Sequence, residues 1–142
     1  MTVRAILEAK GRQVVTIDPA AKVSAAVRLL SERRIGAVLV TSDGRIEGIL
    51  SERDIVRVLG KRGASVLDEP VRAVMTAKVI TCKSADTVAA LMEKMTEGKF
   101  RHLPVVEDDR VIGLISIGDV VKRRVMEYEQ EQEALRDYIK TA

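Results

Sequence analysis

A serine followed three residues later by an aspartate, at the end of an apolar run, is the pattern in this sequence best suited to binding chemistry. The motif Gly-x-x-Ser-x-x-Asp occupies residues 48–54 and recurs 65 positions later at residues 113–119. A serine that begins a helix accepts a hydrogen bond from a first-turn amide, and an acidic residue there is favoured by the positive helix end. A carboxylate held at such a corner can also accept hydrogen bonds from both ribose hydroxyls, while the helix N-terminus suits phosphate. The residues alone leave two readings open, capping alone and capping combined with ligand binding.

The sequence has few of the residues that a catalytic or zinc-binding site needs. Nucleophilic catalysis needs a base beside the nucleophile, and the single histidine, His102, has no serine or cysteine next to it. One histidine and one cysteine, Cys82, do not supply the Cys/His ligand set of a zinc site. We therefore expect a protein that is not an enzyme, with Cys82 as a small buried hydrophobe. Whether a metal accompanies a bound ligand stays open.

The composition is that of a folded protein without a membrane segment. Hydrophobic residues make up 46% of the 142 residues and charged residues 32%. The 24 basic and 21 acidic side chains are spread along the chain, and aromatic residues are only 2%, which argues against nucleic acid as a partner. No apolar run reaches the roughly 18 residues that a membrane span needs, and no secretory segment is recognisable. A cytoplasmic location is the expectation.

The elements that position the two motifs form an internal repeat. The offset of 65 holds without a gap from Val14 to Val56 in the first copy, and each copy predicts the order β-α-β-β-α. Strands are expected at residues 14–17, 35–41 and 46–50, and again from Val79, at 100–106 and at 111–115; helices are expected at 23–30 and 88–95. Asp86 is the expected N-cap of the second of these helices, and Gly98 is the residue expected to end it. One copy is too small to be stable alone, so we expect the two to pack face to face.

The repeats and the tail divide the chain into three parts. Helix breakers cluster at residues 60–64 and 68–70, which places repeat 1 at 1–63 and repeat 2 at 64–124. A further likeness, between residues 3–7 and 71–75, lies upstream of each copy. After Asp119 the pattern becomes one long helix, whose stretch 125–142 is expected to be a solvated or partner-facing extension.

These features together resemble the tandem CBS-domain proteins, also called Bateman modules, of the free-standing pair type. The resemblance rests on the two motifs, on Val74-Met75-Thr76 before the second copy, and on residues 100–106 before its hairpin. It implies an α/β fold of two β-α-β-β-α repeats related by pseudo-twofold symmetry, plus a long C-terminal helix. It also implies a regulatory sensor that binds an adenosine nucleotide (AMP, ADP, ATP or NAD) between the repeats and signals by a conformational change to an unidentified protein. A homodimer through the helices at 51–59 and 119–125 is expected. A structural or interaction module with vestigial sites is the alternative.

The resemblance further implies two sites, each completed by the other repeat. In the first, the ribose, adenine and phosphate contacts would come from Ser51, Asp54, Arg72, Val79, Ile80, Phe100, Arg101 and His102. In the second, they would come from Val15, Ile35, Gly36, Ala37, Ser116, Gly118 and Asp119. Gly36 and Ala37 occupy the positions that match Arg101 and His102, so the Asp54 site is expected to bind phosphate better.

Overall fold

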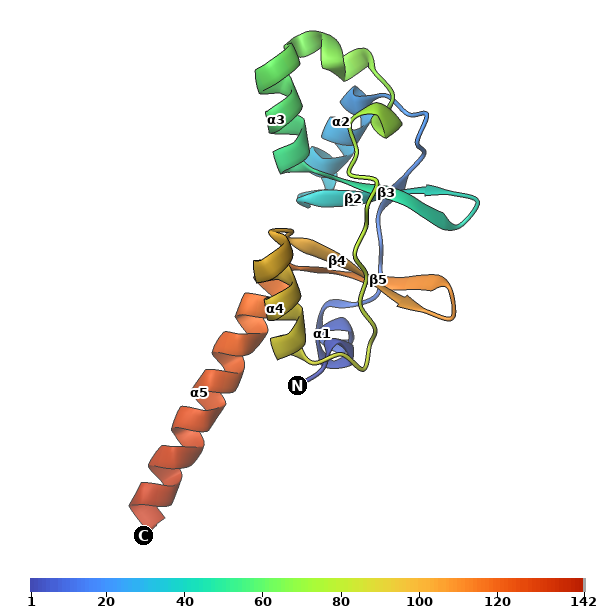
Figure 1. Cartoon of the computed structure of the whole chain (residues 1–142). Coiled ribbons are helices and arrows are strands. Elements are labelled where there is room, and N and C mark those ends of the chain that lie inside the picture. Colours follow the sequence, from blue (N-terminus) through green and yellow to red (C-terminus); the bar gives the residue numbers. More distant parts are fainter. Residues whose placement is uncertain (142) are drawn as a thin grey trace. The chain divides into compact units, whose positions relative to one another are not determined.

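The computed structural model describes residues 1–141, which fold into two compact units. One unit is Gln13–Ile80; the other combines Met1–Arg12 with the chain from Thr81 onward. Figure 1 shows the mixture of helices and short strands in both, which confirms the predicted α/β class. No described helix is long and apolar enough to cross a membrane.

The Gln13–Ile80 unit is built on a three-stranded sheet in the order β1-β2-β3. The strands β1 (Thr16–Ile17) and β2 (Ala37–Ser42) pair in parallel, and β2 pairs antiparallel with β3 (Arg45–Ser51). The helices are α2 (Val23–Arg33), α3 (Glu52–Arg62) and the short 3-10 turns η1 (Ala64–Asp68) and η2 (Val71–Ala73). Their apolar positions make one core: Val23, Ala26, Leu30, Val38, Val40, Leu50, Ile55, Val66, Val71 and Val74.

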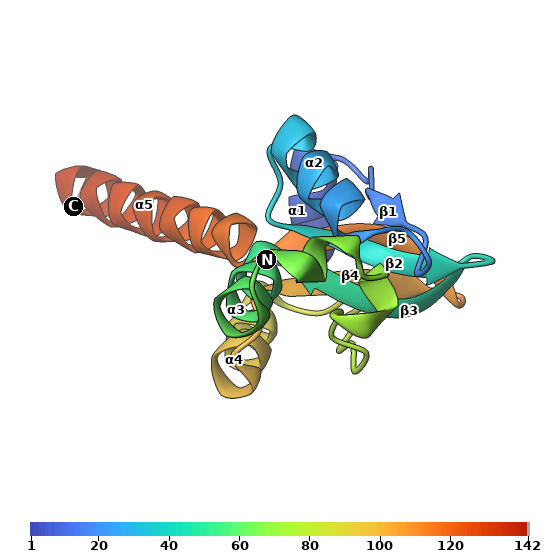
Figure 2. The same ribbon diagram turned by 90° about the horizontal axis from the view of Figure 1, so that it is seen from above.

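The other unit contains the second motif and both chain ends. Its elements are α1 (Val3–Lys10), α4 (Val88–Gly98), β4 (His102–Glu107), β5 (Arg110–Ser116) and the 25-residue helix α5 (Ile117–Thr141). In Figure 2 α5 extends well beyond the β4–β5 hairpin of its own unit, and the side chains of its outer half are mostly exposed, as predicted. The core comprises Val3, Ile6, Leu7, Cys82, Val88, Leu91, Met95, Leu103, Val105, Ile115 and Val120.

The two hairpins share their irregularities, which supports the repeat. Each has a register shift at the same place, between Val40 and Thr41 in the first and between Val105 and Val106 in the second. The first strand, in contrast, forms only in the first copy. There the Leu39 N–H donates to the Val15 carbonyl, whereas the matching residue in the second copy is Pro104, which has no N–H. The predicted strand beginning at Val79 is therefore wrong, and an isolated parallel bridge from Cys82 to Val105 takes its place.

Two details of the helix ends differ from the sequence expectations. The N-cap of α4 is Thr87, whose hydroxyl accepts from the Ala90 amide at 3.0 Å, while the Asp86 carboxylate accepts from the Lys83 amide instead. The glycine-rich stretch after the first motif is partly helical, because α3 runs through Gly60 and ends at Arg62, with Gly63 (φ of 75°) as its C-cap. Gly98 is the last residue of α4, as expected.

The helix α1 packs in the unit of the second repeat, although it precedes the first repeat in sequence. The Val3 amide donates to the Asp86 carbonyl, and the Val88 amide donates to the Met1 carbonyl. The corresponding segment of the Gln13–Ile80 unit is residues 71–76, whose Thr76 pairs with Ile49 of β3. The likeness between residues 3–7 and 71–75 is thus matched by similar positions in the two units. The predicted limits of the repeats, 1–63, 64–124 and 125–142, are divisions of the sequence and stay predictions.

Candidate functional site

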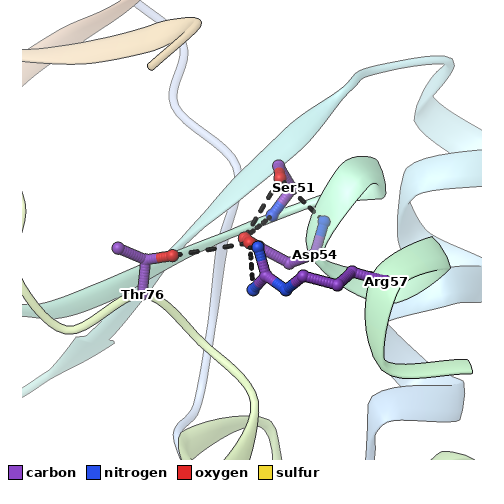
Figure 3. Close-up of polar contacts among 4 residues, drawn as sticks. All are labelled: Ser51, Asp54, Arg57 and Thr76. Atoms are coloured by element: carbon purple, nitrogen blue, oxygen red, sulfur yellow. Dashed lines mark hydrogen bonds and ion pairs between the residues drawn. The ribbon is translucent and has the colours of Figure 1, made fainter. Parts of the chain in front are cut away.

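The Asp54 corner is a reciprocal capping box between β3 and α3, as the motif predicts (Figure 3). The Ser51 hydroxyl accepts from the Asp54 amide at 3.2 Å, and the Ser51 amide donates to Asp54 Oδ2 at 3.0 Å. The same hydroxyl donates to Oδ2, also at 3.0 Å. These three bonds satisfy donors at the helix start and fix the carboxylate in orientation.

The second carboxylate oxygen of Asp54 has different partners. Figure 3 shows the Arg57 guanidinium and the Thr76 hydroxyl directed at Oδ1, at 2.9 and 3.5 Å. The Asp54 side chain is only 9% exposed, whereas that of Arg57 is 55% exposed. Oδ1 is therefore covered by a cation with a solvent-exposed side chain, which can move away at small cost.

The Asp119 corner repeats the cap but has different further partners. The Asp119 amide donates to the Ser116 hydroxyl at 3.1 Å, and the Ser116 amide donates to Asp119 Oδ2 at 2.9 Å. The Lys10 ammonium, at the end of α1, donates to the same Oδ2 at 2.7 Å. Burial raises the pKa of Asp119, but the hydrogen bonds from Lys10 and Ser116 outweigh it and hold this pKa below its usual value.

Lys10 and Thr76 play equivalent parts in the two units. The Thr76 amide donates to the Ile49 carbonyl at 2.9 Å, and its hydroxyl reaches the corner carboxylate of the same unit. The Lys10 ammonium makes both kinds of bond by itself, donating to the carbonyl of Leu114, the repeat partner of Ile49, at 2.8 Å and to the corner carboxylate. A neutral hydroxyl in one unit is thus replaced by a cation in the other.

The glycine that opens each motif lets another segment of the same unit approach the strand closely. That segment is residues 75–76 in one unit and α1 in the other. A Cβ placed on Gly48 would lie 2.6 Å from the Met75 sulfur and 2.8 Å from the Thr76 carbonyl oxygen. A Cβ on Gly113 would lie 2.4 Å from a methyl carbon of Leu7. Each glycine therefore allows close packing against a segment that also partners the corner carboxylate, and the contact with backbone at Gly48 is the stricter of the two.

The predicted site residues are divided between the two units. The Gln13–Ile80 unit holds Val15, Ile35, Gly36, Ala37, Ser51, Asp54, Arg72, Val79 and Ile80. The other unit holds Phe100, Arg101, His102, Ser116, Gly118 and Asp119. The assignment of each residue to a site completed by the other repeat stays a prediction.

Within each unit, the start of the preceding strand flanks the corner of the same repeat. The Glu52 amide donates to the Gly36 carbonyl at 2.9 Å, and Ala37 pairs with the cap serine. In the other unit the Ile117 amide donates to the Arg101 carbonyl at 2.7 Å, and His102 pairs with the cap serine. The backbone of the basic pair Arg101 and His102 thus lies next to the Asp119 corner.

Sequence reasoning missed three partners of the corner carboxylates: Lys10, Arg57 and Thr76. Arg57 follows Asp54 by three residues on a helix, a spacing that brings side chains together. Thr76 belongs to the Val-Met-Thr segment, and only the likeness of residues 3–7 to 71–75 pointed toward Lys10.

Among the residues that the structure describes, no group of three or more His, Cys, Asp or Glu could hold a metal ion. Cys82 is buried as predicted, and burial raises its pKa to about 12.

The repeat and its capped corners define a pair of CBS domains. The family model for the CBS domain matches residues 3–61 and 71–125, so the chain belongs to the CBS-domain family, as its residues suggested.

Several solved and curated proteins are similar to it. The CBS-domain containing protein ATU1752 from Agrobacterium tumefaciens is 46% identical with a TM-score of 0.86, covering 87% of this chain and 99% of that one. PAE2072 from Pyrobaculum aerophilum, a CBS domain protein solved in complex with AMP, is 28% identical with a TM-score of 0.74, covering 84% of this chain and 89% of that one. The mitochondrial protein CBSX3 of Arabidopsis thaliana is 36% identical over 80% of this chain, which spans 58% of the length of CBSX3. The chain spans only 22% of another Arabidopsis relative, CBSCBSPB5.

Proposed function

We propose that this chain is a regulatory module that binds an adenosine nucleotide at its Ser-x-x-Asp corners and acts through a conformational change, without chemistry of its own. The observation that carries the proposal is the fixed orientation of Asp54, whose Oδ2 accepts two hydrogen bonds from Ser51 at 3.0 Å. A carboxylate held in this way meets a ribose without first losing conformational entropy. The complex of PAE2072 with AMP, in the same family, supports an adenosine ligand.

Ribose recognition at the Asp54 corner requires only a local exchange of partners. Both ribose hydroxyls are donors, and a carboxylate is an acceptor with about four lone-pair sites. Arg57, with a side chain that is 55% exposed, can leave Oδ1, and the Ser51 hydroxyl can rotate away from Oδ2, so that one ribose hydroxyl donates to each oxygen. The Arg57 guanidinium regains water when it leaves, and a ribose hydroxyl replaces its bond to the buried carboxylate, so the exchange costs little.

The phosphate and the base would be held by the residues that the resemblance assigns. The side chains of Arg101, His102 and Arg72 would supply positive charge and donors to phosphate, and Val79, Ile80 and Phe100 would surround adenine. With aromatic residues at 2% of the chain, the base is held mainly by aliphatic side chains and backbone groups, which suits the modest affinity of a sensor. AMP, ADP, ATP and NAD share this adenosine portion and differ in the phosphate and in what it carries.

Calorimetric titration with AMP tests the proposal and the ranking of the two corners. Asp54→Ala is expected to weaken AMP binding by about 1 to 3 kcal/mol, because the ribose hydroxyls lose their acceptor. Asp68→Ala is the matched control, since it removes a carboxylate that is 85% exposed from the same unit and should leave binding unchanged.

Two outcomes would contradict this account. Loss of binding on Asp119→Ala, with none on Asp54→Ala, would reverse the ranking of the corners. Absence of AMP, ADP, ATP and NAD binding at millimolar ligand would reject nucleotide sensing and favour an interaction module with vestigial sites.

A further inference from the structure

Lys10 sets the Asp119 corner apart from its twin. Its ammonium donates to Asp119 Oδ2 at 2.7 Å, and that oxygen already accepts from the Ser116 amide at 2.9 Å. A carboxylate oxygen has two lone pairs, so these two donors fill Oδ2. The twin oxygen, Asp54 Oδ2, is filled as well, by the amide and the hydroxyl of Ser51, but a neutral hydroxyl can rotate away. A ribose that used both oxygens of Asp119 would have to displace the ammonium, because the amide is part of the helix cap.

The position of Lys10 makes it harder to displace than Arg57. Its ammonium is anchored a second time, by a 2.8 Å bond to the Leu114 carbonyl. It also ends α1, whose Val3 and Leu7 are among the most deeply buried side chains of the protein. The guanidinium of Arg57, in contrast, covers only Oδ1 of its carboxylate and belongs to a side chain that is 55% exposed, against 36% for that of Lys10.

We propose that Lys10 is an internal competitor for the ribose hydroxyls at Asp119 and thereby determines the affinity of that corner. Ligand entry there requires the ammonium to leave Oδ2, which breaks one of the two bonds that hold the end of α1 at the β5–α5 corner. The Asp119 corner thus binds more weakly than its carboxylate alone would allow, and its occupancy is coupled to the docking of α1. This inference rests on the proposed nucleotide binding.

The effect of Lys10 on ligand affinity is measured in a protein with only the Asp119 corner and with an uncharged ligand. Asp54→Ala removes the other corner, and adenosine, which has no phosphate, avoids any attraction between phosphate and the lysine. In this background Lys10→Met is expected to tighten adenosine binding by about two- to fivefold, the equivalent of an exposed ion pair. Methionine is as good a helix former as lysine, so α1 is preserved.

Two further variants serve as controls. Lys10→Arg keeps a cation at this position and should leave adenosine affinity close to that of the Asp54→Ala background. Lys140→Met removes an equal charge from an exposed position of α5 far from Asp119 and should also leave the affinity unchanged. Tightening by Lys10→Met alone supports the inference, whereas unchanged or weaker binding in this variant overturns it.

The ion pair itself has a readout that does not depend on any ligand. Carboxyl resonances followed by NMR should show the pKa of Asp119 rising in Lys10→Met, since a donor and a nearby cation are lost. If that pKa rises but no variant, and no unmodified chain, binds AMP or adenosine, the proposed function fails and this inference with it. If AMP binds and Lys10→Met changes neither the pKa nor the affinity, only this inference fails.

Discussion

The corner aspartates serve structure first and are available to a ligand second. Each closes a helix cap through Oδ2, and the two differ in what else they meet: Arg57 and Thr76 in one unit, Lys10 in the other. The sequence could predict the serine and aspartate, because a cap is a local feature with a fixed spacing. It could not predict Lys10, which comes from more than 100 residues away and reaches Asp119 only through the packing of α1.

The glycine of each motif gives a prediction at the same scale. Gly48→Ala should lower the free energy of unfolding by about 1 to 3 kcal/mol, since its Cβ would meet a backbone carbonyl that is itself paired in the sheet. Gly113→Ala should cost less, because its Cβ meets only the end of the Leu7 side chain, which has rotamers to use. Urea denaturation of both variants measures the difference.

Gly60→Ala is the matched control for these two substitutions. Gly60 lies within α3 with nothing within 4 Å of an added Cβ, so this change should stabilise the protein by about 0.5 to 1 kcal/mol. An equal loss of stability in Gly48→Ala and Gly113→Ala would show that the backbone contact at Thr76 is not the reason for a glycine.

At the scale of elements, the periodic patterns predicted helices and hairpins well. Apolar residues at helical spacing correctly indicated α2 and α4, and aliphatic runs indicated β2 to β5, because amphipathic burial is visible in the order of residues. The absence of the first strand in the second copy was not predicted. Pro104 has no N–H to donate to the neighbouring segment, and this loss is seen only when the two segments are placed side by side. The packing of α1 in the unit of the second repeat is likewise decided by tertiary contacts, which a local sequence pattern does not reveal.

The helices also carry a prediction about assembly. Exposed apolar side chains lie on both helices that follow the motifs: Val56 of α3 is 68% exposed, and Val121 and Val125 of α5 are 49% and 50% exposed. We propose that these faces join two copies, because burying such side chains is favourable. Light scattering at micromolar concentration should give twice the 15.6 kDa chain mass, and Val121→Glu should shift the protein toward monomer.

An exposed acidic residue further along the same helix provides the comparison. Asp137→Asn changes an exposed position on a different side of α5 from Val121 and Val125 and should leave the dimer intact. A monomer in the unmodified chain would reject the assembly.

At the scale of the molecule, a duplicated sequence has become two units that differ in the partners of their corner carboxylates. The duplication was evident from the ungapped offset of 65, and family membership confirms it. The sequence ranked the Asp54 corner above the Asp119 corner because its expected phosphate contacts include Arg101 and His102. The structure adds a second cause of inequality, the Lys10 cation at Asp119. Both causes act in the same direction in our account, which expects the Asp54 corner to bind more tightly.

The most direct test of that account changes the ligand and leaves the protein intact. The chain is titrated by calorimetry with AMP and with its 2′,3′-dideoxy analogue, which keeps the base and the phosphate but offers no ribose hydroxyl to a carboxylate. AMP should bind, and the analogue should bind more weakly by about 1 to 3 kcal/mol, the cost of leaving a buried acceptor without its donor. Equal affinity for the two ligands would contradict ribose recognition by the Ser-x-x-Asp corners.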